Sequence, residues 1–202
     1  MGVFSVTGAE IVMAIPDLTK SGVLPPHNGS QNGGPVRQAD LSPFPATTLE
    51  LCQKFGDTPE RRVILRGYLQ FRARLTDLQV VNGFQWVDGH FLEAYEKRTR
   101  KAPDHIRVVT FCYPSPMVSD PHYARLAEPL KKGRDTRATF HVDHSLIPLN
   151  WPAQDIIEAT RFQSAILSHS DNGVWKGYVR INLNTLTEDA AASEHLAAQD
   201  ML

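Results

Sequence analysis

Residues at the ends of three apolar runs have the types and the spacing to act on phosphates. Gly89 and His90 follow the run "GFQWVD", and His105 and Arg107 lie two apart where "IRVVTFCY" begins. Asp143 lies within a third run, "ATFHVDHSLIPL". Side chains two apart on a strand point to the same face of a sheet. If the three runs are neighbouring strands, these five residues meet at one edge of the sheet.

Phosphoryl transfer with two Mg²⁺ ions sets requirements that this edge meets only in part. The ions need hard oxygen ligands, chiefly carboxylates, and a glycine before a small hydroxyl residue lets a phosphate approach the backbone. Gly89 and Asp143 fit this pattern, whereas His105 and Arg107 stand where an aspartate pair is required. A guanidinium carries a fixed positive charge that repels a metal ion, and imidazole is a poor Mg²⁺ ligand. The usual two-metal chemistry is therefore not expected.

Short strands must position these residues. The segment "GFQWVDG" predicts a strand followed by a turn at Gly89, and "IRVVTFCY" has the β-branched and aromatic composition of a buried strand. The stretch "ATFHVDHSLIPL" alternates at first, so we expect a third strand that ends near Pro148. A last strand is expected in "VWKGYVRINL".

Helices are expected around these strands. Thr58 predicts an N-cap and Pro59 a first helical residue, followed by apolar residues at spacings of three and four up to Leu78. Further helices are expected at 121–132 and from Pro152 onward. The arginines between the apolar positions of the first helix are expected on its solvated side; they are Arg61, Arg62, Arg66, Arg72 and Arg74.

Helices mixed with a few strands predict an α/β (α+β) fold with a mixed sheet flanked by helices. The sheet domain is expected at 47–185. Residues 1–46 predict an extended N-terminal arm with a flexible Gly/Pro-rich loop, "HNGSQNGGP". Residues 186–202 have a helix-forming composition and a weak apolar face, so we expect a helical tail that frays or packs on a protein partner.

The composition limits the classes of function. A net charge of −1 gives no global field for nucleic acid or membranes, so any such contact needs a local patch. The two cysteines, Cys52 and Cys112, form no CxxC pair and indicate a reducing cytoplasm. No run of about 18 apolar residues predicts a membrane span. We therefore expect a cytoplasmic protein without a membrane contact.

Five segments together carry a resemblance to a known group of proteins. They are "IPDLTKSGVLPP" (15–26), "VDGHF" (87–91), "APDHIRVVTF" (102–111), "FHVDHSLIPLNWP" (140–152) and "GVWKGYVRINL" (173–183). This pattern resembles the nucleotidyltransferase superfamily with the DNA polymerase β-type fold, and more narrowly an uncharacterised bacterial family within it. That family shows a "GS" after the first strand and a "P-N-D-I-D-V-V" strand. The resemblance extends from residue 15 to about 185.

The resemblance implies a nucleotidyltransferase-like mixed sheet with a degenerate catalytic motif. The serine of the family is His90 here, its metal-binding aspartates fall on His105 and Arg107, and only the third acidic position, Asp143, matches. Lys176 is expected near a nucleotide phosphate. The chain is thus predicted to be a non-catalytic protein that needs no cofactor and binds a nucleoside triphosphate, RNA or a protein partner. The resemblance also implies a bacterial toxin–antitoxin or phage-defence setting.

Three interpretations of this edge remain open from the sequence. Arg107 and Asp143 could form a salt bridge where a metal would otherwise lie. Gly89, His90, His105, Arg107 and Lys176 could instead capture a phosphate without a metal. A third possibility is a Zn²⁺ or Fe²⁺ site made by Asp143, His105 and His141.

The alternative function is an active enzyme. It would transfer a nucleotidyl group from a nucleoside triphosphate with Mg²⁺ held by Asp88, Asp104 and Asp143. Asp104 directly precedes the expected pair, so a register slip of one residue would bring it to the site. The same slip would turn Ile106 outward, which makes this alternative the less favourable one.

Overall fold

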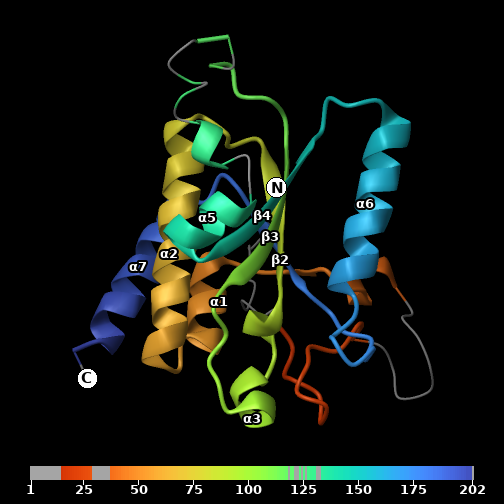
Figure 1. Ribbon diagram of the computed structural model, residues 1–202, viewed down its shortest axis with the longest axis vertical. Coiled ribbons are helices and arrows are strands. Elements are labelled where there is room, and N and C mark those ends of the chain that lie inside the picture. Colours follow the sequence, from red (N-terminus) through yellow and green to blue (C-terminus); the bar gives the residue numbers. More distant parts are fainter. Residues whose placement is uncertain are drawn as a thin grey trace, which may run out of the picture.

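The computed structural model describes residues 15–28, 37–117, 119–120, 123, 125, 127–130 and 133–201. Helices cover both faces of a central sheet, as Figure 1 shows. The predicted α/β fold with a mixed sheet is confirmed. Within the described ranges, no helix is long and apolar enough to cross a membrane.

The five-stranded sheet has the order β1-β5-β2-β3-β4. Strand β2 runs antiparallel to both of its neighbours, whereas β3–β4 and β1–β5 are parallel pairs. Parallel pairing of β3 and β4 places the starts of both strands at the same edge. The strands are β1 (Phe44–Pro45), β2 (Gly83–Asp88), β3 (Ile106–Cys112), β4 (Val142–Pro148) and β5 (Val179–Asn182).

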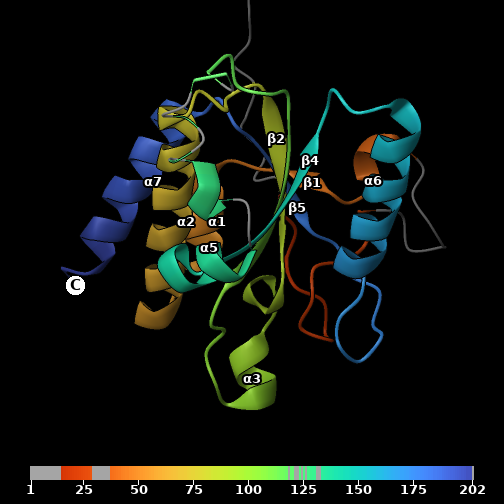
Figure 2. The same cartoon turned by 45° about the horizontal axis from the view of Figure 1, so that its top comes forward.

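One face of the sheet packs against the main helical layer. This layer holds α1 (Thr48–Phe55), α2 (Pro59–Asp77), α5 (Gly133–Phe140) and α7 (Leu186–Gln199), and Figure 2 shows the four together on one side. The core between them contains buried side chains from α2 and from alternate strand positions. Examples are Leu65, Tyr68, Val87, Val108 and Ile181.

The opposite face of the sheet is covered by one helix, α6 (Ala153–Leu167). Trp86, Val109 and Phe111 of the sheet pack there with Leu167. Because strand side chains alternate, Asp88, Arg107 and Asp143 also belong to this face. The predicted site therefore lies on the side of the sheet that carries α6. The short helices η1 (Gln38–Asp40), η2 (His90–Leu92), α3 (Tyr95–Thr99) and η3 (Glu128–Leu130) complete the described elements.

Local signals explain where α2 begins and how closely it packs. The Thr58 hydroxyl accepts a hydrogen bond from the Arg61 backbone N–H, and Pro59 is the first helical residue, as predicted. Gly67 lies in mid-helix, where a glycine is normally unfavourable. A Cβ there would lie 2.1 Å from the carbonyl oxygen of Phe140, so the glycine allows α5 to approach α2.

The prediction that all five arginines of α2 are solvated is wrong for two of them. Arg72 is only 2% exposed, and its guanidinium donates to Gln85 on β2 and to Asp189 on α7. Arg61 is also buried and donates to Glu96 and to backbone carbonyls after β2. Both side chains find several acceptors, which is the condition for burying a charge.

The tail is part of the folded domain. The expectation that 186–202 frays is wrong for α7, whose Asp189 accepts hydrogen bonds from Thr48 of α1 and from Arg72 of α2, whereas a protein partner for this segment stays a prediction. Asp200, just after α7, pairs with Arg62 and Arg66. The helical composition of this segment was predicted correctly.

Three other segments differ from expectation or lie partly outside the described ranges. Residues 138–140, expected to open the third strand, are the end of α5, and the strand begins at Val142. The Gly/Pro-rich loop of the N-terminal arm falls largely on 29–36, and the helix expected at 121–132 falls partly on residues outside the described ranges. The arm between 15 and 28 contributes buried Val23 and Leu24 to the domain.

Candidate functional site

The strand register brings the predicted residues together. Asp88 on β2 is the partner of Arg107 on β3, and Arg107 is the partner of Asp143 on β4. Gly89 follows Asp88 with a φ of +95°, a conformation that L side chains rarely adopt. A Cβ on Gly89 would lie 3.3 Å from the backbone nitrogen of Arg107. The positive φ therefore favours a glycine here, and a Cβ would in addition press closely on the backbone of β3.

Arg107 lies at the centre of this edge. Its Nε donates to Oδ2 of Asp143 over 3.3 Å, and its side chain stays 37% exposed. His105 Nε2 is 4.0 Å from the same carboxylate oxygen. A guanidinium has five N–H donors, and the contact with Asp143 uses one of them. Arg107 therefore has donors left for a ligand.

Asp104 anchors the outer part of the edge. Its carboxylate accepts from Arg137 of α5 and lies 2.6 Å from Nδ1 of His105, while its backbone carbonyl is 3.3 Å from Nδ1 of His141. Burial raises the pKa of Asp104, but the hydrogen bonds from Arg137 and His105 outweigh this and lower it to about 2. Asp104 is therefore an anion that is already paired.

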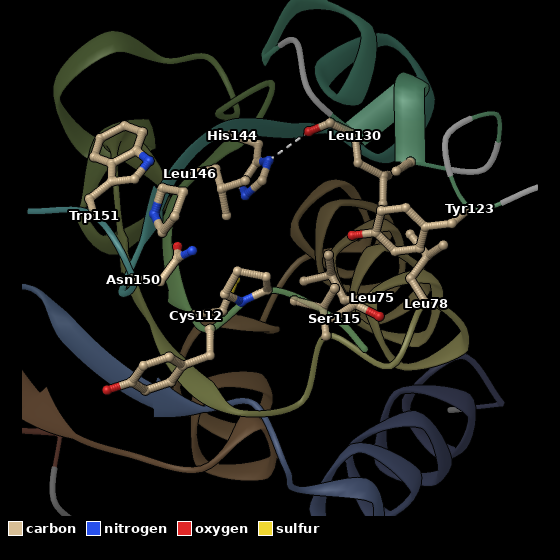
Figure 3. A pocket seen from close by; sticks show the side chains of 15 residues that line it. Leu75, Leu78, Cys112, Ser115, Tyr123, Leu130, His144, Leu146, Asn150 and Trp151 are labelled. Atoms are coloured by element: carbon tan, nitrogen blue, oxygen red, sulfur yellow. Dashed lines mark hydrogen bonds between the residues drawn. The ribbon is translucent and has the colours of Figure 1, made fainter. Parts of the chain in front are cut away.

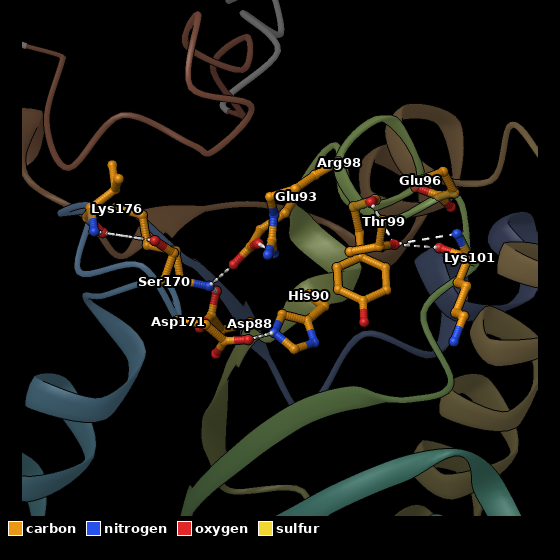
Figure 4. Close-up of polar contacts among 12 residues, drawn as sticks. Asp88, His90, Glu93, Glu96, Arg98, Thr99, Lys101, Ser170, Asp171 and Lys176 are labelled. Carbon is orange, nitrogen blue, oxygen red and sulfur yellow. Dashed lines mark hydrogen bonds and ion pairs between the residues drawn. The ribbon is translucent and has the colours of Figure 1, made fainter.

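His90 does not occupy the place of a small hydroxyl residue over a phosphate. Its Nε2 lies 2.7 Å from Oδ2 of Asp171, and its ring stacks on Tyr95 with centroids 4.5 Å apart. Figure 4 shows His90 beside Asp171. The guanidinium carbon of Arg98 in turn lies 5.3 Å from the ring centroid of Tyr95. These contacts fix His90 as a wall of the site.

A buried ion cluster lies directly behind Gly89. Lys176 Nζ donates to Asp88 Oδ1 and to Glu93 Oε1, each over 2.9 Å, and all three side chains are buried (Figure 4). Arg98 donates to the other oxygen of Glu93. Lys176 therefore holds the β2 turn in place. Because both carboxylates already bind its ammonium, Lys176 is not available to a nucleotide phosphate, contrary to the prediction.

The electrostatics of this cluster follow from its burial. Desolvation raises the pKa of Asp88 to about 6, although Lys176 and the backbone N–H of Gly89 act against it. Desolvation alone would lower the pKa of Lys176, but the two carboxylates outweigh it and raise the pKa. Gly89 therefore contributes the shape of its turn to this edge, while its backbone N–H favours the charged form of Asp88 and lowers its pKa.

The candidate metal ligands do not converge. No group of three or more His, Cys, Asp or Glu residues in the described ranges is arranged to hold a metal ion. The predicted set of Asp143, His105 and His141 is therefore not supported, because His141 points its Nδ1 to the Asp104 backbone. The set of Asp88, Asp104 and Asp143 is likewise not arranged to hold Mg²⁺, because Asp88 is buried against Lys176.

Several residues of this site were not identified from the sequence. Glu93, Arg98, Tyr95, Asp171 and Arg137 shape or neutralise its walls. The one local signal was the basic segment "EKRTRK", which contains Arg98. Apart from the stacking of Tyr95 on nearby His90, the other contacts join residues far apart in the chain, such as His90 and Asp171 at a separation of 81.

Comparison with protein families gives one match. A family model described as a family of unknown function, DUF6932, matches residues 16–182. The chain belongs to this family. The matched segment contains all five strands and the whole edge that holds Gly89, Arg107 and Asp143. Comparisons with curated proteins and with solved structures gave no match.

Proposed function

We propose that this DUF6932 protein has a nucleotidyltransferase-like fold whose catalytic edge has become a metal-independent site for a phosphate-bearing ligand, a nucleoside triphosphate or the phosphates of RNA. The observation that carries the proposal is Arg107. It takes the central position of the edge, between the strand partners Asp88 and Asp143, and keeps exposed donors. Arginine suits phosphate because its planar fork of donors matches two phosphate oxygens.

The surroundings of Arg107 support a phosphate ligand over a metal. Asp88 is buried and neutralised by Lys176, and Asp104 is paired with Arg137 and His105. Asp143 is the remaining carboxylate, and it already contacts Arg107. A single carboxylate, 34% exposed and beside a guanidinium, is a poor site for Mg²⁺. The ion is bound by carboxylates, and the positive charge of the guanidinium repels it. A phosphate would replace Asp143 as the partner of Arg107.

The binding experiment compares Arg107 with a matched arginine elsewhere. Titration calorimetry with each nucleoside triphosphate in excess EDTA is run on the wild type, Arg107→Gln and Arg74→Gln. Arg74 is a fair control because its side chain is 46% exposed, has an aspartate partner at 3.6 Å, and lies on α2 behind the other face of the sheet. Hydrogen bonds to charged groups contribute about 1.5–3 kcal/mol, so Arg107→Gln should weaken binding about 10- to 100-fold.

Two results decide between this proposal and the alternative enzyme. Equal loss of affinity in Arg107→Gln and Arg74→Gln would mean that the ligand responds only to net charge. Transfer of a nucleotidyl group by the wild-type chain with Mg²⁺ would support the enzyme that uses Asp88, Asp104 and Asp143. The proposal expects transfer, if any, only after His90→Ser, His105→Asp and Arg107→Asp are combined.

The proposal includes a biological context, a cellular location and a surface for a protein partner. The bacterial toxin–antitoxin or phage-defence context follows from the resemblance to nucleotidyltransferases, and the cytoplasmic location from the two cysteines that form no CxxC pair. A protein partner would use the outer side of α7, because its inner side is engaged by Thr48 and Arg72. A partner on α7 would leave the edge at Arg107 open.

A further inference from the structure

A cavity lies where β3 and β4 end, away from Arg107 at the start of β3. It is a cavity of about 390 Å³ between the end of α2, the segment after β3 and the end of β4. Figure 3 shows Leu75, Leu78 and Tyr123 on one side of it and Trp151 and Asn150 on the other. Leu75, Leu78, Val80, Cys112 and Leu130 are buried walls, whereas Leu146 and Trp151 are half exposed at its mouth.

His144 is the histidine among the described residues of the cavity wall, and a chain of hydrogen bonds holds its ring neutral. Nδ1 of His144 is 2.9 Å from the carbonyl oxygen of Leu130, which can only accept, so Nδ1 carries the proton (Figure 3). Nε2 must then accept, and the Thr110 hydroxyl donates to it over 2.9 Å. The Gln85 amide donates to Thr110 in turn, and its oxygen accepts from Tyr68.

Among the described residues that line the cavity, none is an Asp, Glu, Lys or Arg, and this chain of hydrogen bonds keeps His144 uncharged. Every polar atom from Tyr68 to His144 has a partner inside the protein, so the ring offers nothing to an ion. Burial lowers the pKa of His144 to about 4, and burial raises the pKa of the Cys112 thiol to about 11, so both groups are neutral at pH 7. A charged molecule would lose its hydration here without a counter-ion.

We propose that this cavity is a binding site for an uncharged, largely aromatic small molecule of about two to three rings, with any polar substituent at the mouth beside Asn150. Its volume lies in the range of about 300–1,000 Å³ typical of small-molecule sites. A cavity of about 150 Å³ admits benzene, so 390 Å³ corresponds to roughly two to three such rings. Water is a poor occupant, because each molecule needs two to four polar partners.

This site is independent of the proposed phosphate site. It lies where β3 and β4 end, at Cys112 and Pro148, whereas Arg107 and Asp143 lie where those strands begin. The ligand chemistries are also opposite, since one site offers exposed donors and the other an uncharged apolar wall. Failure of either proposal therefore leaves the other standing.

The test uses two dyes that share one ring system. N-phenyl-naphthylamine is neutral and brightens in an apolar site, and anilinonaphthalene sulfonate adds an anionic group to the same rings. The neutral dye is expected to saturate at one molecule per chain, and the sulfonate to bind at least about tenfold more weakly because its charge cannot be paired. Equal affinities for both dyes would overturn the proposal, as would a neutral dye that never saturates.

Three variants locate the bound dye. Leu146→Asp places an anion at the mouth and should weaken binding of the neutral dye at least about tenfold. Phe162→Asp places an anion on the exposed apolar side of α6, away from the cavity, and should leave binding of the neutral dye unchanged. Leu146→Trp, which fills the mouth with an apolar ring, gives the same loss should the aspartate variant not fold. Binding that survives both Leu146 variants, or is lost in Phe162→Asp, would contradict the assignment.

Discussion

Acidification should destabilise the protein through His144. The ring is buried between Thr110, the Leu130 carbonyl and the edge of Phe71, whose ring centroid is 4.7 Å away. Burial lowers its pKa from 6.5 to about 4, although the Leu130 carbonyl and Asp143 act in the opposite direction. The unfolded chain therefore takes up a proton on this ring at a higher pH than the folded chain does.

The size of the effect follows from the two pKa values. Where the unfolded state binds more protons than the folded state, lowering the pH lowers the free energy of unfolding. For His144 this happens as the pH drops from 6.5 to about 4. One pKa unit is equivalent to about 1.4 kcal/mol, so the full difference is about 3 kcal/mol. The contribution of His144 is present above pH 6.5 and is lost as the pH falls through about 4. Asp104 acts in a lower window, since its pKa falls from 3.8 to about 2.

Urea denaturation from pH 7 to pH 4 measures this directly. His144→Gln should be less stable than the wild type at pH 7, because buried partners lose a bond, and the stability difference between the two should shrink as the pH falls. His169→Gln, at an exposed position after α6, is the control and should keep the wild-type pH dependence. A wild-type His144 ring that titrates near 6.5 by NMR would refute the argument, because it would mean that water reaches the ring.

Three further predictions concern the buried cluster and the helix contact. Lys176→Met leaves two buried carboxylates without their cation and should cost about 3–5 kcal/mol of unfolding free energy in urea, whereas Lys54→Met, which breaks an exposed pair, should change little. Burial raises the pKa of Asp88 from 3.8 to about 6, so the contribution of Asp88 to stability falls as the pH rises between these values, opposite in sign to that of His144; Asp88→Asn should therefore make the loss of stability on acidification steeper, and an unchanged pH profile would contradict this. Gly67→Ala, normally stabilising in a helix by about 1 kcal/mol, should instead lower the melting temperature, because the new Cβ would meet the Phe140 carbonyl at 2.1 Å.

Local patterns were sufficient to predict β2, β3 and the start of α2, but not β1, which lies in the segment expected to be an extended arm. The alternation in "GFQWVDG" and the β-branched run from Ile106 placed β2 and β3 correctly, and the Thr58–Pro59 signal placed the start of α2. The convergence of Gly89, Arg107 and Asp143 then follows from strand pairing. The strands and the helix start depend on neighbours in the chain, which is why the sequence predicts them, whereas the convergence depended on the assumption that the three runs are neighbouring strands.

The buried charges depend on contacts between distant parts of the chain. Lys176 lies 88 residues from Asp88, and Arg72 lies 117 from Asp189, so no spacing rule connects them. A lone arginine between apolar positions looks solvated from sequence, although three or more distant acceptors can bury it, as at Arg72. Such long-range pairs explain why Lys176 was assigned to the site rather than to its support.

The boundary between α5 and β4 shows a different limit. His141 separates the two elements with a φ of +56°, which is uncommon for a residue other than glycine. The run "ATFHVDH" continues its alternation across that position, so the pattern predicted one long strand. Contact of Phe140 with α2 decides in favour of the helix, and that contact is tertiary.

The central claim is that Arg107 replaces a metal in holding phosphate. Its most direct test is the ratio of two dissociation constants for the same nucleoside triphosphate, one measured by calorimetry in excess EDTA and one in excess Mg²⁺. A protein that binds phosphate through Arg107 should bind in EDTA at least as tightly as with Mg²⁺, because the metal competes with the guanidinium for the phosphate oxygens. Binding that is absent in EDTA and restored by Mg²⁺ would contradict the account and point to an intact metal site.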